Sequence, residues 1–243
     1  MIYPNVKTGR FLERPNRFIA YVEVDGERQI CHVKNTGRCR ELLVPGAEVG
    51  VQHLPSPTRR TAYDLISVRK GNRLINMDSA APNQVFAQWA QAGQFLPGLT
   101  EFRREVTHGD SRFDFYMEAG LKKIFVEIKG VTLEENGVAR FPDAPTLRGV
   151  KHLNGLSRCV EEGYEAWAVF VIQMKDVRWM EPNRATHPEF ADALSKAAAA
   201  GVHLLALDCN ADWDRLEIRQ PVEIRRSEPH GFRRSSQWPE SSG

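Results

Sequence analysis

The chain has 243 residues, of which 42% are hydrophobic and 26% are charged, a composition typical of a folded protein and unlike a disordered or fibrous one. The first 20 residues contain no apolar run suited to a signal peptide, and no later run approaches the ~20 residues of a membrane span. Cys31, Cys39, Cys159 and Cys209 form no Cys-x-x-Cys pair, which argues against a zinc site and against a disulfide framework. We therefore expect a reduced cytoplasmic protein that does not act in a membrane.

The charge is unevenly distributed along the chain. The net charge is +2, but residues 1–75 contain 13 Lys and Arg against 7 Asp and Glu, which is +6. The remainder has 20 against 24, which is −4. A basic module joined to a mildly acidic one indicates a polyanionic partner on one side and a carboxylate-bearing site on the other.

Short β segments separated by turns are expected up to about residue 76. Asp25-Gly26 between two such segments is a strong signal for a β-hairpin. The expected strands are 17–24, 29–33, 48–53, 63–69 and 73–77. Five short strands in about 75 residues indicate a small barrel of the OB type, and we place this first domain at residues 1–78.

A second domain is expected where helical spacing of apolar residues replaces the β pattern. Ser79 can cap a helix that ends before Gly93. Further strands are expected at 102–107, 112–118, 123–129, 166–172 and 202–207, and further helices at 146–162 and 189–200. This order predicts a mixed α/β domain over residues 79–226. Residues 227–243 are mostly Ser, Pro, Gly, Arg and Glu, and we expect a disordered tail.

Glu127 and Lys129 project from the same face of the strand predicted at 123–129, because side chains alternate between the two faces of a strand. The apolar face of the preceding strand is expected to consist of Phe113, Phe115 and Met117. Asp114 lies on its opposite face. If the two strands form a hairpin that turns at residues 120–121, opposite residue numbers sum to 241, and Asp114 faces Glu127.

Two carboxylates in contact need compensation, because like charges opposite each other destabilise a sheet. A shared proton, the ammonium of Lys129 or a divalent cation could supply it. A Mg²⁺ or Mn²⁺ ion held by Asp114 and Glu127 would stabilise charge at a phosphorus centre, and Lys129 could orient or deprotonate the attacking water. The alternative is an exposed edge strand on which Glu127 and Lys129 form a surface ion pair.

An Asp on one strand and Glu-x-Lys on the next, ahead of a helix, resemble the PD-(D/E)XK nuclease core. By this resemblance Asp114, Glu127 and Lys129 match its catalytic motif. The sequence departs from the motif in two places, because Phe113 stands where the motif has proline and the first-helix glutamate of many members has no clear counterpart. The polar residues near that position are Gln84, Gln88 and Glu105.

Four longer stretches resemble the sugar fermentation stimulation protein A (SfsA) family. They are HVKNTGR at 32–38, EVTHGDSRFDF at 105–115, VEIKGVTL at 126–133 and FPDAPTLRGVKHL at 141–153. This resemblance covers nearly all of residues 1–208. It implies a bacterial DNA-binding protein linked to sugar utilisation, with an OB-like N-terminal domain and a nuclease-like C-terminal domain.

Both expected domains contain side chains suited to phosphate contacts. The candidate nucleic-acid-binding residues are His32, Lys34, Asn35, Arg38, Arg112, Arg148 and Lys151. Thr146 could cap the helix that carries two of them, so that its free amides hold a phosphate; a capped helix with a solvated basic side is the alternative. Because aromatic residues are sparse in the first domain, we expect phosphate contacts to single- or double-stranded DNA with little sequence specificity and a steep salt dependence.

Three functions are consistent with these features. The first is a sequence-nonspecific DNA-binding protein, regulatory in sugar metabolism, whose nuclease-like site is active or vestigial. The second is a divalent-metal-dependent nuclease that hydrolyses phosphodiesters. The third is a factor of sugar metabolism that binds a protein or a phosphorylated metabolite.

Overall fold

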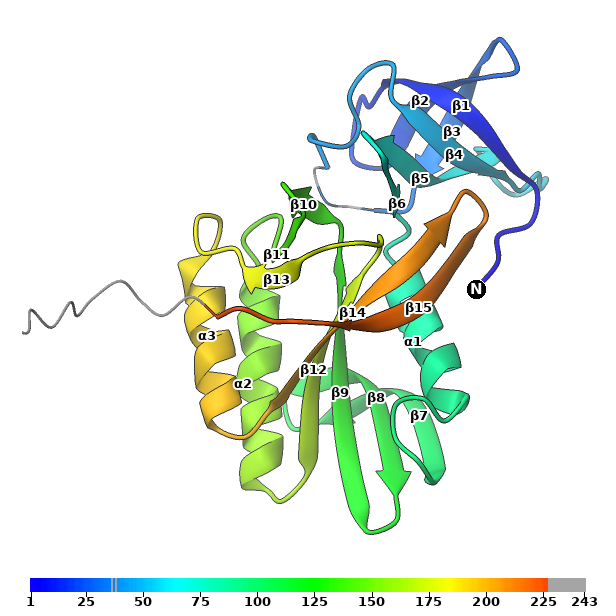
Figure 1. Ribbon diagram of the computed structural model, residues 1–243. Coiled ribbons are helices and arrows are strands. Elements are labelled where there is room, and N and C mark those ends of the chain that lie inside the picture. The colour runs from blue at the N-terminus through cyan, green and yellow to red at the C-terminus, as the bar shows by residue number, and fades with distance from the viewer. Residues whose placement is uncertain (36, 38, 227–243) are drawn as a thin grey trace, which may run out of the picture.

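The computed structural model describes residues 1–35, 37 and 39–226. It shows a small β-barrel beside an α/β domain, which agrees with the predicted order of the fold (Figure 1). Within the described residues no helix is both long enough and apolar enough to cross a membrane. The predicted disordered tail, residues 227–243, lies outside the described residues.

The barrel is a strongly curved sheet with the strand order β3-β2-β1-β4-β5-β6, closed by a parallel pairing of β3 with β5. Its strands are β1 (Val6–Glu13), β2 (Ile19–Val24), β3 (Glu27–Val33), β4 (Glu48–His53), β5 (Tyr63–Lys70) and β6 (Arg73–Asn76). The sequence did not predict β1, because Lys7, Gly9 and Arg10 interrupt the apolar alternation. Gly9 is required for packing, since a Cβ there would lie 2.5 Å from the carbonyl oxygen of Glu23 on β2.

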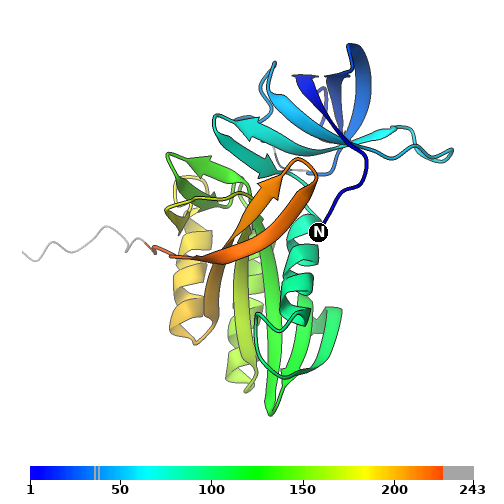
Figure 2. The ribbon, with the colours of Figure 1, turned by 45° about the vertical axis from the view of Figure 1, so that its right-hand side comes forward.

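The α/β domain contains a main sheet with the order β15-β14-β12-β9-β8-β7, in which β12 runs parallel to β9 and β14. Helices α2 (Leu147–Glu161) and α3 (Pro188–Ala199) cover one face, and α1 (Ala81–Gln91) covers the other (Figures 1 and 2). The main strands are β7 (Leu99–His108), β8 (Ser111–Ala119), β9 (Lys122–Val131), β12 (Glu165–Ile172), β14 (His203–Asp212) and β15 (Arg215–Val222). A small second sheet contains β10 (Leu133–Glu135), β11 (Val138–Phe141) and β13 (Trp179–Pro182).

The three predicted helices and the strands predicted for the main sheet overlap the observed elements, and Thr146 caps α2 by accepting a hydrogen bond from the amide of Gly149 at 3.0 Å. Ser79 does not cap α1. Its hydroxyl donates to the backbone carbonyl of Lys34, and the Asp78 carboxylate accepts from the amide of Ala80 at 2.9 Å instead. The strands of the second sheet and β15 were not predicted, because they are short or carry charged residues at alternate positions.

A buried polar network joins the barrel to the α/β domain. The side-chain amide of Gln173, just after β12, donates to Asn76 Oδ1 and to the Asp78 carbonyl, both at 3.0 Å. The Asp78 carboxylate, in a residue only 1% exposed, accepts from the Tyr3 hydroxyl at 3.2 Å and from the ammonium of Lys34. The barrel is therefore attached through satisfied buried hydrogen bonds, which fix its orientation on the sheet.

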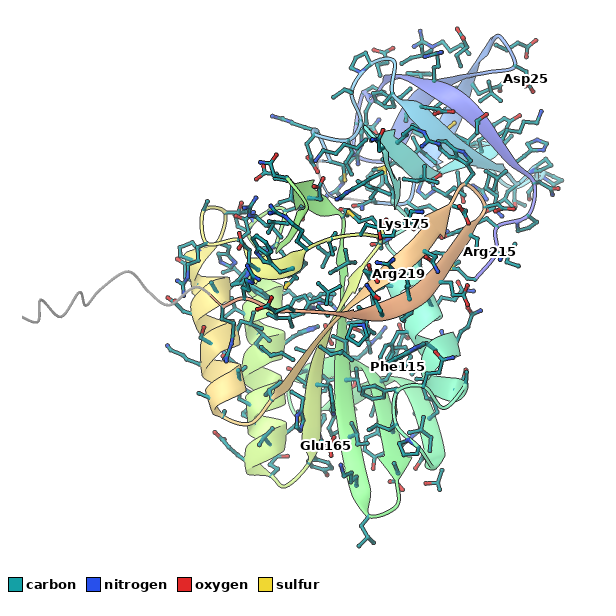
Figure 3. All side chains as sticks on the ribbon, in the orientation of Figure 1. Asp25, Phe115, Glu165, Lys175, Arg215 and Arg219 are labelled. Carbon is teal, nitrogen blue, oxygen red and sulfur yellow. The ribbon has the colours of Figure 1, made fainter. Side chains whose placement is uncertain are left out.

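The first residues of the chain also contact the α/β domain. Ile2 forms an antiparallel bridge with Arg215 of β15, and the amide of Tyr3 donates to the carbonyl of Asp214 at 2.7 Å. The start of the chain therefore lies against β15, on which Figure 3 labels Arg215 and Arg219. The barrel is consequently anchored to the second domain both before β1 and after β6.

Candidate active site

The hairpin of β8 and β9 has the predicted register, because Phe115 lies opposite Val126 and these numbers sum to 241. The strand β9 lies between β8 and β12, inside the sheet. Glu127 is opposite Ala168 of β12 and only 4% exposed. The ion pair of the alternative interpretation is present, since Lys129 Nζ lies 2.6 Å from Glu127 Oε1, but its placement on an exposed edge strand is wrong.

One face assignment on β8 was also wrong, because Phe113 does not share the face of Phe115. The ring of Phe115 lies 5.5 Å from that of Phe86 on α1, on the α1 side of the sheet (Figure 3). The ring of Phe113 lies 5.3 Å from that of Phe125, on the α2 side. Between the two phenylalanines the partner strand contains Glu105 with a φ of 55°, a left-handed conformation that distorts the regular alternation.

Asp114 lies where this distortion occurs and where β8 separates from β9. Its Oδ2 accepts a hydrogen bond from the amide of Ile128 at 2.7 Å, and its Oδ1 accepts one from the side-chain amide of Asn83 at 2.7 Å. Burial and the charge of Glu127 raise the pKa of Asp114, against the opposing effect of these hydrogen bonds and of Lys129. The carboxylate is thus fixed in position and close enough to Glu127 to interact electrostatically.

Asn83 is a site residue that the sequence analysis missed. It lies in the first turn of α1, the helix for which the nuclease motif calls for a glutamate, and it contacts Asp114 directly. Gln84 and Gln88 of the same helix are exposed, and Glu105 forms an exposed ion pair with Arg112 instead. The signal in the sequence was limited to a polar residue in the first turn of the predicted helix, because its contact with Asp114 depends on how that helix packs against the sheet.

Glu127 is the most enclosed member of the site. Its Oε1 accepts from Lys129 Nζ at 2.6 Å and from Nδ1 of His152. Burial raises the pKa of Glu127, but the hydrogen bond from His152 and the ammonium of Lys129 outweigh it and place the pKa below the ordinary glutamate value. The second oxygen, Oε2, is buried and has no hydrogen-bond partner among the described residues.

His152 and Arg148 support Glu127 from α2. His152 is 5% exposed, and its Nε2 receives a hydrogen bond from Nε of Arg148 at 3.3 Å. Because an arginine Nε only donates, Nε2 is the unprotonated nitrogen, so Nδ1 carries the proton that is donated to Glu127. Arg148 is exposed and at the same time supports His152, so its contact with nucleic acid stays a prediction. His152 is a second residue that the prediction did not include.

The predicted residues Lys151 and Arg112 lie outside this group. Lys151 is 3.7 Å from Asp110, and Arg112 is 2.8 Å from Glu105, both in exposed ion pairs. Exposed pairs such as these are weak, so the two cations remain accessible to phosphate. Sequence spacing alone could not show their acidic neighbours.

The barrel residues that were predicted to bind nucleic acid have different surroundings. The ammonium of Lys34 is engaged by the buried Asp78 at the domain junction, whereas His32 lies 3.6 Å from Asp64 with a partly exposed ring. Asn35 accepts a hydrogen bond from the amide of Gly37 at 2.8 Å and thereby shapes its own loop. Arg38 lies outside the described residues.

A metal ion could be held by Asp114 and Glu127. Among the described residues no three His, Cys, Asp or Glu side chains gather in an arrangement that could hold a metal by themselves. Two carboxylates nevertheless suit Mg²⁺, which takes its remaining ligands from water and phosphate oxygens. The unpartnered Oε2 of Glu127 is a buried oxygen of the kind that a hard cation prefers, so the donor set fits such an ion.

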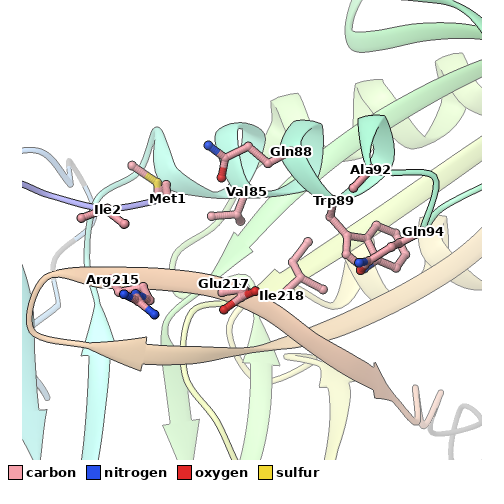
Figure 4. A pocket seen from close by; sticks show the side chains of 10 residues that line it. All are labelled: Met1, Ile2, Val85, Gln88, Trp89, Ala92, Gln94, Arg215, Glu217 and Ile218. Carbon is pink, nitrogen blue, oxygen red and sulfur yellow. The ribbon is translucent and has the colours of Figure 1, made fainter.

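A hollow of about 360 Å³ between α1 and β15 is a poorer candidate (Figure 4). Its lining includes Trp89, Gln88 and Arg215, and Glu217 is its single carboxylate among the lining residues described. It lies against the opposite side of the sheet from His152 and α2. The carboxylate pair on β8 and β9 therefore remains the candidate active site.

The change in melting temperature that Asp114→Asn causes in the metal-free protein is expected to be more favourable at about pH 7 than at about pH 4. Because the folded pKa is raised, wild-type stability declines as pH rises from the unfolded value of 3.8 through the folded pKa, and asparagine avoids this loss. Thermal unfolding in EDTA at both pH values measures the effect, with exposed Asp212→Asn as the control. Equal changes in melting temperature at both pH values would contradict it.

Two family models match the chain in succession. One, described as the SfsA N-terminal OB domain, matches residues 12–77, and the other, described as the sugar fermentation stimulation protein RE domain, matches residues 80–215. The first match confirms the OB type of the predicted barrel.

Curated relatives and a solved structure match over nearly the whole chain. A sugar fermentation stimulation protein homolog of Desulfitobacterium hafniense (strain Y51) is 59% identical over 225 residues, 93% of this chain and 98% of the relative. A homolog of Ruminiclostridium cellulolyticum is 54% identical over 225 residues, 93% of this chain and 100% of the relative. The structure of Pyrococcus furiosus SfsA in complex with Ca²⁺ has a TM-score of 0.84 and 27% identity, covering 93% of this chain and 98% of that chain.

Proposed function

The chain belongs to the sugar fermentation stimulation protein (SfsA) family, and on that premise we propose that it is a divalent-cation-dependent nuclease that binds DNA without sequence preference. The observation that carries this proposal is the buried Oε2 of Glu127, which lacks a partner among the described residues and belongs to a carboxylate that interacts with Asp114. A Mg²⁺ or Mn²⁺ ion would satisfy that oxygen and compensate both charges. The similar Pyrococcus furiosus protein was solved with Ca²⁺, another hard cation with oxygen ligands.

Each side chain of the site would have its own role in phosphodiester hydrolysis. When bound, the metal would stabilise negative charge at phosphorus and make a bound water more acidic. Lys129, whose ammonium is 2.6 Å from Glu127 Oε1, would donate a hydrogen bond to the attacking water or to a phosphate oxygen. Asn83 and the amide of Ile128 keep the Asp114 carboxylate in position. His152 orients Glu127 in the same way.

The barrel would supply most of the DNA affinity. Residues 1–75 have a formal charge of +6 from 13 basic and 7 acidic residues, and cations of this kind bind the phosphate backbone irrespective of sequence. The barrel also lies close to the segment that precedes α2. A Cβ atom added to Gly37, in the loop after β3, would lie only 2.6 Å from Oδ2 of Asp143, which precedes α2. A DNA strand held by the barrel would therefore lie beside the loop that leads into α2 and its supporting residues.

A second candidate function is DNA binding without hydrolysis. The hydrogen bonds from Lys129 and His152 already compensate the charge of Glu127 in the absence of a metal, as in a site that has lost its reaction. Such a protein would still bind DNA through the barrel, but it would leave every substrate intact.

Incubation of the purified protein with labelled single-stranded, duplex and branched DNA tests the proposal. Cleavage is expected with Mg²⁺ or Mn²⁺ and not with EDTA, because the carboxylates alone cannot stabilise charge at phosphorus. Products are resolved on denaturing gels, and binding is measured in parallel at several salt concentrations. Binding without cleavage under every metal condition would leave the second candidate, and no binding near physiological salt would contradict both.

A further inference from the structure

A second hollow, of about 410 Å³, lies in the barrel, at the end of β1 and the segment that precedes β4. We call it the barrel pocket. Apolar side chains of Phe11, Leu43 and Pro45 form part of its lining, and Arg17 and Arg40 contribute exposed cations. An apolar lining edged by cations suits a flat aromatic group that carries a phosphate.

The walls of the barrel pocket are held in place by hydrogen bonds. The guanidinium of Arg14 donates to the carbonyl oxygens of Gly37 at 2.9 Å, Asn35 at 2.8 Å and Arg17 at 2.7 Å. The Asn16 side chain accepts from the backbone amide of Phe18 at 2.9 Å. Because these contacts already fix the β1–β2 loop and the backbones of Asn35 and Gly37, a ligand would not have to order them, which favours affinity.

An exposed aromatic ring follows directly after the pocket residue Arg17. Phe18 is 45% exposed, and the Arg17 guanidinium lies 4.7 Å from its ring centroid. A single exposed phenylalanine is ordinary. Phe18 does not line the pocket itself, but it adjoins the lining residue Arg17, and a phenylalanine with an arginine is the kind of surface on which unpaired bases stack.

The charges around the pocket favour an anionic ligand. Glu13 is the acidic lining residue, and it is paired with Arg28 at 2.6 Å. The lining contains three arginines, Arg14, Arg17 and Arg40, against this one paired carboxylate, so the charge of the lining itself is positive. A base in a duplex is stacked and paired and would have to leave the duplex to enter such a hollow. The base of an unpaired nucleotide can enter directly.

From these observations we infer that the barrel pocket binds an unpaired base of single-stranded DNA, with Phe18 as a stacking surface and the arginines against the flanking phosphates. The inference rests on the proposed function, because it takes DNA as the ligand. It adds that the DNA bound at this pocket is single-stranded.

Binding of strands with and without bases tests this inference. Fluorescence anisotropy of the full chain in EDTA compares oligothymidylate of about 20 nucleotides with a strand of equal length and charge that lacks bases. Wild type is expected to bind the thymidylate about tenfold more tightly, because stacking needs a base and phosphate contacts do not. Phe18→Ala is expected to lose this preference, whereas Ile30→Ala, an equally exposed apolar residue on β3, is expected to keep it.

The outcomes separate this inference from the proposed nuclease. Equal affinity for the two strands, or an unchanged preference in Phe18→Ala, overturns the pocket while leaving cleavage to be judged by its own assay. A base preference that disappears in Phe18→Ala supports the pocket even when no metal produces cleavage. If polyglutamate of equal charge displaced the thymidylate from wild type but not from Phe18→Ala, the pocket would be a site for acidic proteins. That result would overturn the inference.

Discussion

Glu127→Gln is expected to reduce metal-dependent DNA cleavage by about a thousandfold or more, because a metal contributes several kcal/mol of charge stabilisation in the transition state. Glutamine keeps the size of the side chain and can still accept a hydrogen bond from Lys129 or His152. It removes the negative charge and places an amide where Oε2 would contact the cation. Initial cleavage rates at saturating Mg²⁺ or Mn²⁺ measure the effect, and anisotropy in EDTA is expected to show unchanged DNA affinity.

Glu101→Gln is the matched control for this substitution. Glu101 lies on β7 and forms a surface ion pair with Arg103 at 2.7 Å, so the variant has the same change in charge without touching the site. Its cleavage rate is expected to equal that of wild type. A Glu127→Gln protein that cleaves within tenfold of wild type would show that Glu127 does not hold the metal.

Asp78→Ala is expected to destabilise the protein by about 3 kcal/mol, because removal of one partner from a buried charged pair leaves the others unsatisfied. The substitution removes the acceptor of the Tyr3 hydroxyl, of the Lys34 ammonium and of the Ala80 amide. For a chain of this length the corresponding decrease in melting temperature is roughly 6 to 12 °C. Differential scanning calorimetry in EDTA measures it.

Asp25→Asn serves as the control for the junction, because asparagine removes the charge and tolerates the left-handed backbone of this residue, whose φ is 54°. Asp25 pairs with Lys7 at 2.6 Å, both side chains are exposed, and Figure 3 shows Asp25 at the outer end of the barrel. Such a pair contributes about 0 to 1 kcal/mol, so the melting temperature is expected to remain close to that of wild type. If both variants melted at the same temperature, the junction network would not contribute measurably to stability.

The fold and the central residues of the site were accessible from sequence because they depend on local rules. Strand alternation and the Gly120 turn were sufficient to bring Asp114 and Glu127 together, and the observed register is the one these rules predict. The strand β1 was not accessible, because glycine and charged residues mask its alternation. The shift of Phe113 to the other face depends on a left-handed residue in the neighbouring strand, which no pattern in β8 itself indicates.

The residues around the carboxylates depend on tertiary packing and were missed for that reason. Asn83 reaches Asp114 because α1 begins close to β8, and His152 reaches Glu127 because α2 crosses the opposite face of β9. Neither crossing can be calculated from spacing along one element. In the same way, Lys34 was predicted as a phosphate contact, yet the structure pairs it with Asp78, a residue 44 positions away.

The anchoring of the barrel on both sides has a mechanical consequence. A domain attached by a single linker can rotate about that linker. Here residues 2–3 are hydrogen-bonded to the β14–β15 hairpin, and the chain after β6 is held by the Asp78 network before it enters α1. The orientation of the barrel relative to the α/β domain is therefore expected to stay nearly constant. If the proposed function is correct, DNA would be bound on surfaces whose spacing is already set, without a closing motion of the barrel.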